Sequence, residues 1–238
     1  MIDLMFDYWD RIELAVFDVD GTLYHQNVVR RRMMFDLLFE AARTQSLETI
    51  EVLRFYRRQR EYLADCEECN FEALLRDQVA NRCKVARARL DNIIQEWLHT
   101  RPLRYIARSA VAGVDKAFRT IRCSGRKIGV LSDYPAEAKL RVLGLEADYI
   151  VSADMPQVGR MKPHPSGLLH VMELAGTAPA ATLLVGDRQD RDGAAARRAG
   201  ARWLMRGSKA NSSGAECFGD FRQPPFDLIR PLTVSRCT

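Results

Sequence analysis

Two aspartates, Asp18 and Asp20, directly follow a short apolar segment, residues 14–17, that is typical of a buried strand. Gly21 and Thr22 come next and predict a sharp turn. Ligands bind at the carboxyl ends of the strands in a parallel α/β sheet. Paired carboxylates there can divide two tasks, since one attacks or binds a metal ion and the other moves a proton. The alternative, a strand that simply ends in an Asp-Gly turn, does not account for three matching segments downstream.

The first of these segments contains Ser132, which ends the apolar run 127–131 and precedes Asp133. A hydroxyl group and free backbone N–H groups between a strand and a helix can bind phosphate oxygens. Ser-Asp pairs also occur as simple helix caps. Ser132 and Asp133 are therefore candidate phosphate-binding residues whose interpretation depends on the other segments.

The second segment places Lys162 in a loop that contains Pro163 and Pro165. Proline restricts the backbone and so limits where the lysine can point. A lysine held beside carboxylates could neutralise both a phosphate group and the oxygen that attacks it. Taken alone, a lysine in such a loop would be interpreted as a surface residue.

The third segment, residues 186–192, follows another apolar run and carries Asp187, Asp190 and Asp192. Clustered carboxylate oxygens with room for water favour Mg²⁺. Charge repulsion makes such a cluster costly unless a cation offsets it. An acidic loop that caps the next helix is the alternative, but it does not explain why both acidic segments follow apolar strands.

The composition is that of an ordinary soluble domain, with 238 residues, 47% apolar and 28% charged. No apolar run of about 18 residues predicts a membrane span. The N-terminus is acidic and lacks the pattern of a signal peptide, so a cytoplasmic location is expected. The net charge is +5, but no nucleic-acid-binding motif accompanies it, which disfavours a nucleic-acid partner.

Cys66 and Cys69 have the spacing of a zinc-binding pair. No second such pair follows, whereas a structural zinc site takes four ligands. We interpret these cysteines as free thiols on a helix, with a metal or redox role as the open alternative.

The chain changes character twice. Residues 28–108 lack glycine and show helical periodicity, which predicts three to five amphipathic helices. From residue 126, apolar strand-like runs alternate with helical segments, which predicts a parallel sheet.

The helical block, inserted after the first acidic turn, would overhang the strand ends and could act as a lid. An insertion without a gating role is the alternative. Residues 207–238 are predicted to be mostly loop.

The four segments resemble, in their order and surroundings, the motifs of the haloacid dehalogenase-like hydrolase superfamily. They are Asp18-x-Asp20-Gly21-Thr22, Ser132, Lys162 and Gly186–Asp192. The resemblance covers residues 12–206. It implies a Rossmann-like, doubly wound parallel sheet formed by residues 1–24 and 109–238. It also implies an all-helical cap domain formed by residues 25–108, as in phosphoglycolate-phosphatase-like members.

The resemblance assigns a role to each candidate. Asp18 would be the nucleophile that forms an aspartyl-phosphate, and Asp20 would protonate the leaving oxygen and then activate water. The carboxylates of Asp18 and Asp187, with the backbone carbonyl of Asp20, would bind Mg²⁺. Ser132 would hold the transferred phosphoryl group, and Lys162 would offset its charge.

The remaining members of the expected site are less well defined. Gly21, Thr22 and Asp133 are expected to help bind the substrate. Asp192 would orient Lys162 or a metal-bound water, with Asp190 as the alternative.

The expected activity is therefore a Mg²⁺-dependent phosphatase that acts on a small phosphorylated metabolite. Dehalogenase members of the superfamily lack a carboxylate at the position of Asp20, so its presence indicates a phosphate ester. The alternatives are a phosphomutase of the same fold, a non-catalytic binding module and a nucleic-acid end phosphatase. A monomer and a homodimer fit equally well.

Substrate selection is expected to depend on the helical block. His25 and the arginines 30–32 fall just after the first acidic turn. An arginine there would suit a second anionic group on the substrate, and exposed helix charges are an equally good interpretation.

Overall fold

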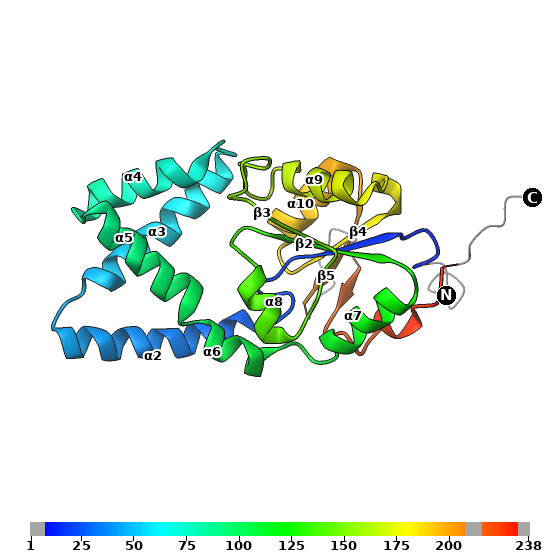
Figure 1. Cartoon of the computed structure of the whole chain (residues 1–238), viewed down its shortest axis with the longest axis horizontal. Helices are drawn as coiled ribbons and strands as arrows, with labels where there is room; N and C mark the ends of the chain where they lie inside the picture. The colour runs from blue at the N-terminus through cyan, green and yellow to red at the C-terminus, as the bar shows by residue number, and fades with distance from the viewer. Residues whose placement is uncertain (1–7, 208–215, 233–238) are drawn as a thin grey trace, which may run out of the picture.

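The computed structural model describes residues 8–207 and 216–232. A six-stranded sheet forms one end of the molecule, with all of its strands parallel and in the order β3-β2-β1-β4-β5-β6 (Figure 1). The strands are β1 Leu14–Phe17, β2 Lys127–Ser132, β3 Tyr149–Ser152, β4 Thr182–Gly186, β5 Arg202–Arg206 and β6 Cys217–Phe218. The predicted parallel sheet is confirmed, and β1 lies near its centre.

Helices cover both faces of the sheet, as in a doubly wound fold (Figure 1). They are α7 Val114–Cys123, α8 Glu137–Leu143, α9 Ser166–Ala175 and α10 Ala194–Ala199. Alternate residues of β1 belong to different cores, because successive side chains of a strand point to opposite faces. Ala15 and Phe17 share a core with Phe118 of α7, whereas Leu14 and Val16 share one with α9. Burial on both faces explains why these strands are continuous apolar runs.

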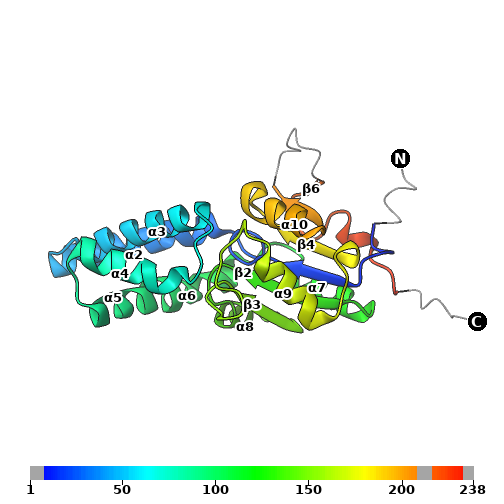
Figure 2. The same ribbon diagram turned by 90° about the horizontal axis from the view of Figure 1, so that it is seen from above.

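A second group of helices projects beyond the carboxyl ends of the strands (Figures 1 and 2). It comprises α2 Gln26–Thr44, α3 Glu48–Asp65, α4 Phe71–Cys83, α5 Arg87–Ile94 and α6 Leu103–Ile106, with a π-helical turn Gln95–Thr100 and a 3-10 turn Ala107–Ser109. Their buried faces carry apolar residues at helical spacing, such as Val29, Met33 and Leu37 of α2. Five helices lie where three to five were predicted. The proposed domain boundaries at residues 25 and 108 stay a prediction.

One local prediction was wrong. Cys66 and Cys69 lie in the turn between α3 and α4 rather than on a helix, and both are exposed free thiols. Positive φ angles at Glu67 and Asn70 keep this turn out of the helical conformation.

The C-terminal region, predicted to be mostly loop, is mostly loop in its described residues 216–232, and it also contributes the short edge strand β6 and an aromatic cluster. Phe218, Phe221 and Phe226 pack against one another with ring centroids 4.8–5.1 Å apart. A strand of two residues is too short to produce a sequence pattern. Within the described residues, no helix is both long and apolar enough to cross a membrane.

Candidate active site

The loop that follows β1 places Asp18 at the centre of the sheet edge. Its backbone N–H donates to the carbonyl of Val185 at 2.8 Å, so the pairing with β4 extends to the aspartate itself. The Asp18 side chain is buried, and the hydroxyl group of Thr22 donates to its Oδ2 at 2.9 Å. The loop therefore holds one oxygen of this carboxylate in a defined direction.

Lys162 lies between two carboxylates. Its buried ammonium group contacts Asp18 Oδ1 and lies 2.7 Å from Asp192 Oδ1. Burial alone would lower the pKa of Lys162, but the two carboxylates outweigh this effect and raise the pKa well above its ordinary value. Lys162 is therefore a permanent cation beside Asp18.

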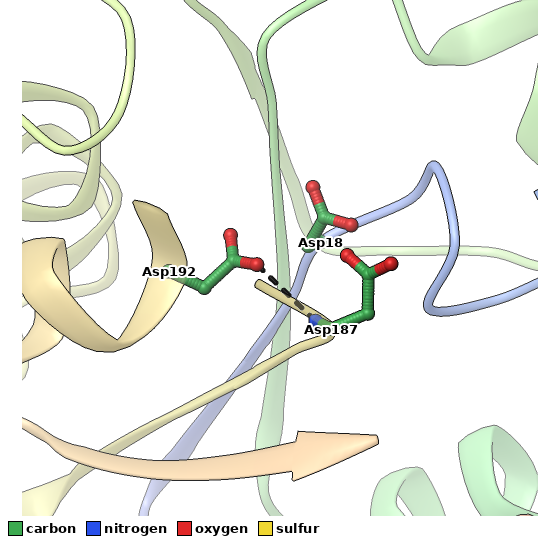
Figure 3. A group of neighbouring side chains, drawn as sticks. All are labelled: Asp18, Asp187 and Asp192. Atoms are coloured by element: carbon green, nitrogen blue, oxygen red, sulfur yellow. Dashed lines mark hydrogen bonds between the residues drawn. The ribbon is translucent and has the colours of Figure 1, made fainter. Parts of the chain in front are cut away.

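Asp18, Asp187 and Asp192 form a compact carboxylate cluster (Figure 3). One oxygen from each of the three lies within 4.8 Å of the others. Asp192 is further held by the backbone N–H groups of Asp187 and Arg188, which donate to its Oδ2 at 3.2 and 3.0 Å. Such a set of oxygen atoms at one point is the donor chemistry that Mg²⁺ prefers.

The charge balance of this cluster also fits a cation. Burial, followed by repulsion from Asp192, raises the pKa of Asp187 to about 6. Burial raises the pKa of Asp18 well above its ordinary value, and the attraction of Lys162 does not cancel the effect. One lysine is thus insufficient for three carboxylates, and a divalent cation bound among them would offset the remaining repulsion.

Gly21 allows Asp187 to approach the first acidic loop. The φ angle of Gly21 is +102°, which strains any other residue. A Cβ atom at this position would also lie 2.0 Å from Asp187 Oδ2. A glycine is therefore required at position 21 for two independent reasons.

Asp20 is separated from the cluster by its own partners. Both of its carboxylate oxygens accept hydrogen bonds from the ammonium group of Lys139 on α8, at 2.7 and 2.6 Å. The hydroxyl group of Tyr24 also donates to Asp20. Burial would raise the pKa of Asp20, but Lys139 and Tyr24 together lower it below its ordinary value. Asp20 is thus held as a carboxylate.

The remaining sequence-predicted residues occupy different positions. The Ser132 hydroxyl is buried and accepts the backbone N–H of Tyr134 at 3.2 Å. Asp133 Oδ1 accepts the backbone N–H of Lys162 at 3.1 Å, which links the two loops. Asp190 is exposed and pairs with Arg188 at 2.9 Å, so Asp192 rather than Asp190 contacts Lys162.

A cavity of about 490 Å³ opens over these side chains, between the sheet edge and the projecting helices. Six of the sequence-predicted residues line it, namely Asp18, Asp20, Asp133, Lys162, Asp187 and Asp192. Gly21, Thr22 and Ser132 are not among the lining residues and act, in this arrangement, from behind the cavity wall. Clustered charges in a partly enclosed cavity are typical of an active site.

A family model for the haloacid dehalogenase-like hydrolases matches residues 12–200, which include all of these site residues. The chain belongs to this hydrolase family. No curated protein matches the sequence.

Solved structures of family members share the fold of this hydrolase. A 2-haloacid dehalogenase from Pseudomonas syringae pv. Tomato DC3000 is 20% identical, with a TM-score of 0.64 over 91% of this chain and 97% of that chain. A HAD phosphatase from Thermococcus onnurineus is 19% identical, with a TM-score of 0.61 over 87% and 92% of the two chains. A β-phosphoglucomutase from Clostridium difficile is 17% identical, with a TM-score of 0.60 over 92% and 95%. These identities support the shared fold alone.

Ion pairs join the projecting helices of this hydrolase to the carboxyl edge of its sheet. Glu61 and Asp65, on the last turns of α3, accept hydrogen bonds from the buried guanidinium group of Arg191 at 3.0 and 2.5 Å. Arg188 also pairs with Glu61 at 3.0 Å. We refer to Glu61, Asp65, Arg188 and Arg191 as the α3 latch. The latch closes one side of the cavity.

A second contact holds α3 over the loop after β2. The buried guanidinium group of Arg60 donates to the backbone carbonyl of Asp133 and lies 4.1 Å from the ring centroid of Tyr134. The same side chain pairs with Glu72 of α4 at 3.1 Å. One arginine therefore connects two projecting helices to a loop that carries candidate site residues.

Several residues of this site were missed by reasoning from sequence. Tyr24 follows Asp20 by four residues, and Lys139 lies on the helix after Ser132. Neither spacing belongs to a general pattern. Arg57 and Arg191 also line the cavity, but Arg57 lies in a basic cluster of a predicted helix and Arg191 lies within the acidic segment 186–192, so neither was predicted as a site residue. Only the packing of helices against the sheet edge distinguishes them.

Proposed function

We propose that this hydrolase is a Mg²⁺-dependent phosphatase that cleaves a small phosphate monoester through an aspartyl-phosphate on Asp18. The observation that carries the proposal is the contact between the Asp18 carboxylate and the Lys162 ammonium at the floor of the cavity. A carboxylate attacks a phosphate dianion only where cations offset their mutual repulsion. Lys162 supplies one such cation.

In the first step, an oxygen of Asp18 forms a bond to phosphorus while the ester P–O bond breaks. The leaving oxygen takes the bonding electrons and receives a proton from the protonated form of Asp20, which the second step regenerates. Thr22 and Lys162 hold Asp18 and so aim its attack. Positioning and charge stabilisation contribute most of the catalysis in phosphoryl transfer.

In the second step, Asp20 accepts a proton from water, whose oxygen attacks phosphorus. The bond between phosphorus and Asp18 breaks, Asp18 is regenerated and inorganic phosphate leaves. Pairing with Lys139 favours the carboxylate form of Asp20, which is the form that this step needs. A general base must be ionised before it can accept the proton.

The carboxylates of Asp18 and Asp187 are the proposed Mg²⁺ ligands, together with the backbone carbonyl of Asp20. When bound, the ion would neutralise charge on the transferred phosphoryl group. Asp192 is proposed to orient Lys162, which it contacts at 2.7 Å. Ser132 and Asp133 are proposed to shape the phosphate site through the loop that follows β2.

Other activities of the family are less well supported. A carboxylate at position 20 has no task in displacing a halide, which leaves without a proton. A phosphomutase would use the same two aspartates and return the phosphoryl group to the substrate. Release of inorganic phosphate separates hydrolysis from such a transfer. A cytoplasmic location and a monomeric or homodimeric state stay predictions from the sequence.

Phosphate release from an aryl phosphate and a panel of phosphorylated metabolites tests the proposal. The assay compares excess Mg²⁺ with EDTA, for the wild type, Asp18→Asn and the control Asp190→Asn. We expect Asp18→Asn to lose at least about a thousandfold in rate while remaining folded, because an amide is a poor nucleophile. Asp190→Asn should retain activity. Near-normal turnover by Asp18→Asn would refute the proposal, and product interconversion without phosphate release would identify a mutase.

A further inference from the structure

Two arginines face the cavity from different projecting helices. Arg30 lies on α2 and Arg57 lies on α3, and both line the cavity that contains Asp18 and Lys162. Both residues keep exposed surface. The cavity therefore holds a second group of positive charges, contributed by the projecting helices.

Neither guanidinium group has a partner in the parts of the chain that the structure describes, where no salt bridge or hydrogen bond involves Arg30 or Arg57. Their neighbours differ in this respect. Arg191 is engaged by the α3 latch, Arg60 binds Glu72 and the loop after β2, and Arg58 lies over the ring of Phe55 at 5.6 Å. Arg30 and Arg57 are thus available to a ligand.

The two arginines also repel each other. Although Arg57 keeps exposed surface, its partial removal from water lowers the pKa of the guanidinium group, Tyr134 opposes this effect, and the positive charge of Arg30 lowers the pKa further. An anion bound between them would offset both effects. Guanidinium groups bind carboxylates and phosphates through two parallel hydrogen bonds, which makes arginine well suited to this task.

The same cavity also has an apolar wall. It is formed by Val29, Met33, Trp97, Leu98 and Pro102. A cavity of about 490 Å³ is in the range that encloses a small organic ligand. Apolar walls with a few placed charges favour a ligand with a carbon body and charged ends.

We propose that Arg30 and Arg57 bind a second anionic group of the substrate, so that this hydrolase selects organic phosphates that also carry a carboxylate or a second phosphate. The inference rests on the proposed function, because it takes the phosphoryl group to lie at Asp18 and Lys162. The carbon body of the substrate then lies along the apolar wall. Arg30 and Arg57 are specificity-determining residues in this view and take no part in bond breaking.

Equilibrium binding of phosphonates tests the proposal without turnover, because their P–C bond resists hydrolysis. Titration calorimetry in Mg²⁺ compares ω-phosphonocarboxylates of increasing chain length, from phosphonoacetate to 6-phosphonohexanoate, with alkylphosphonates of matching length. An α,ω-bisphosphonate series distinguishes a second phosphate from a carboxylate. The variants are Arg30→Gln and Arg57→Gln. Arg54→Gln is the matched control, because Arg54 is exposed on the same helix and does not line the cavity.

We expect at least one doubly charged ligand to bind the wild type about tenfold or more tightly than its neutral-ended match, as one charged hydrogen-bonded contact would give. Arg30→Gln and Arg57→Gln should abolish most of this difference and leave the affinity for alkylphosphonates within about twofold of the wild type. Arg54→Gln should keep the difference between charged and neutral-ended ligands. Equal binding of charged and neutral ligands, or a difference that survives both substitutions, would overturn the second-anion site alone. Absence of binding by every phosphonate would overturn the phosphoryl site as well.

Discussion

The ammonium group of Lys139 lies 2.7 and 2.6 Å from the two carboxylate oxygens of Asp20. This ion pair affects the two tasks proposed for Asp20 in opposite ways. It stabilises the carboxylate form, which accepts a proton from water, and it disfavours the protonated form, which donates a proton to the leaving oxygen. Aryl phosphates, whose leaving groups depart readily without a proton, should therefore be cleaved faster than alkyl phosphates.

Replacing Lys139 with methionine should alter this balance. Without the cation the pKa of Asp20 rises, so activity that depends on its carboxylate is lost at a higher pH as the solution is acidified. Protonated Asp20 also becomes more abundant, which should narrow the advantage of aryl over alkyl phosphates. The measurement is the pH profile of kcat/KM for both substrate types. Lys139→Arg keeps the cation and serves as the control, and unchanged profiles in Lys139→Met would contradict the interpretation.

Mg²⁺ should stabilise the protein more at pH 7.5 than at pH 5. The pKa of Asp187 is about 6 in the folded protein, against an ordinary value of 3.8. Without metal, the folded protein therefore favours the protonated form of Asp187, and the free energy of unfolding falls as the pH rises from about 4 to about 6. Protons and Mg²⁺ compete for the same oxygens, so metal binding is weaker below this pKa. We expect excess Mg²⁺ to raise Tm by about 2–4 °C at pH 7.5, corresponding to ~1 kcal/mol for a chain of this size.

Thermal unfolding at matched ionic strength measures this difference, with Na⁺ replacing Mg²⁺ in the reference sample. Asp187→Asn should lose the effect of Mg²⁺ at both pH values. An equal rise in Tm at pH 5 and pH 7.5, or a rise that persists in Asp187→Asn, would argue against metal binding by these carboxylates.

Gly21→Ala should impair both stability and activity. The substitution forces a side chain into a positive φ angle and against the Asp187 carboxylate, so we expect a loss of about 2–4 kcal/mol in the free energy of unfolding. Gly144→Ala is the control, because Gly144 also has a positive φ angle, of 67°, but a Cβ atom there would contact nothing within 4 Å. It should cost ~1 kcal/mol and leave turnover intact.

Urea denaturation and phosphate release distinguish these two glycines. A similar loss of stability in both variants would mean that backbone strain alone matters at position 21. Full activity in a folded Gly21→Ala protein would show that the approach of Asp187 to this loop is unimportant.

The α3 latch should control local opening of the cavity. Arg191 is buried, whereas Glu61 and Asp65 are largely exposed, so removing Arg191 leaves no buried charge behind. We expect Arg191→Gln to speed hydrogen exchange in residues 59–65 by about tenfold, with little change in α9. Arg188→Gln removes a half-exposed pair and should change exchange by less than about twofold. Equal acceleration in α9 would indicate global destabilisation instead.

Most of the fold was predictable because its signals are local. The strands β1, β2 and β4 are buried on both faces, and such strands appear in the sequence as unbroken apolar runs. Gly144 and Gly176 end α8 and α9 in the left-handed conformation, which is a common position for glycine. Strand β6 was missed because its two residues gain their strand character from pairing with β5, which is a tertiary effect.

The candidate site was predictable only where strand ends meet. Asp18 and Asp187 directly follow β1 and β4, and the carboxyl ends of parallel strands share one edge. The expected roles of Lys162 and Asp192 came from the resemblance to the hydrolase family. The partnership of Lys139 with Asp20 depends on the rotation of α8, and that of Arg191 with Glu61 depends on how α3 approaches the sheet. These relationships arise from helix packing, which the local sequence does not encode.

Helix α3 carries Arg57 facing the cavity and, on its next turns, Glu61 and Asp65 of the latch. Small rotations or shifts of this helix consequently move both sets of side chains together. New substrate preferences cannot arise freely on α3, since a change that suits another ligand also disturbs the attachment of the helix to the sheet edge. The α3 latch contains no residue of α2. Substitutions around Arg30 on α2 could therefore change substrate selectivity in relatives of this chain without disturbing the latch.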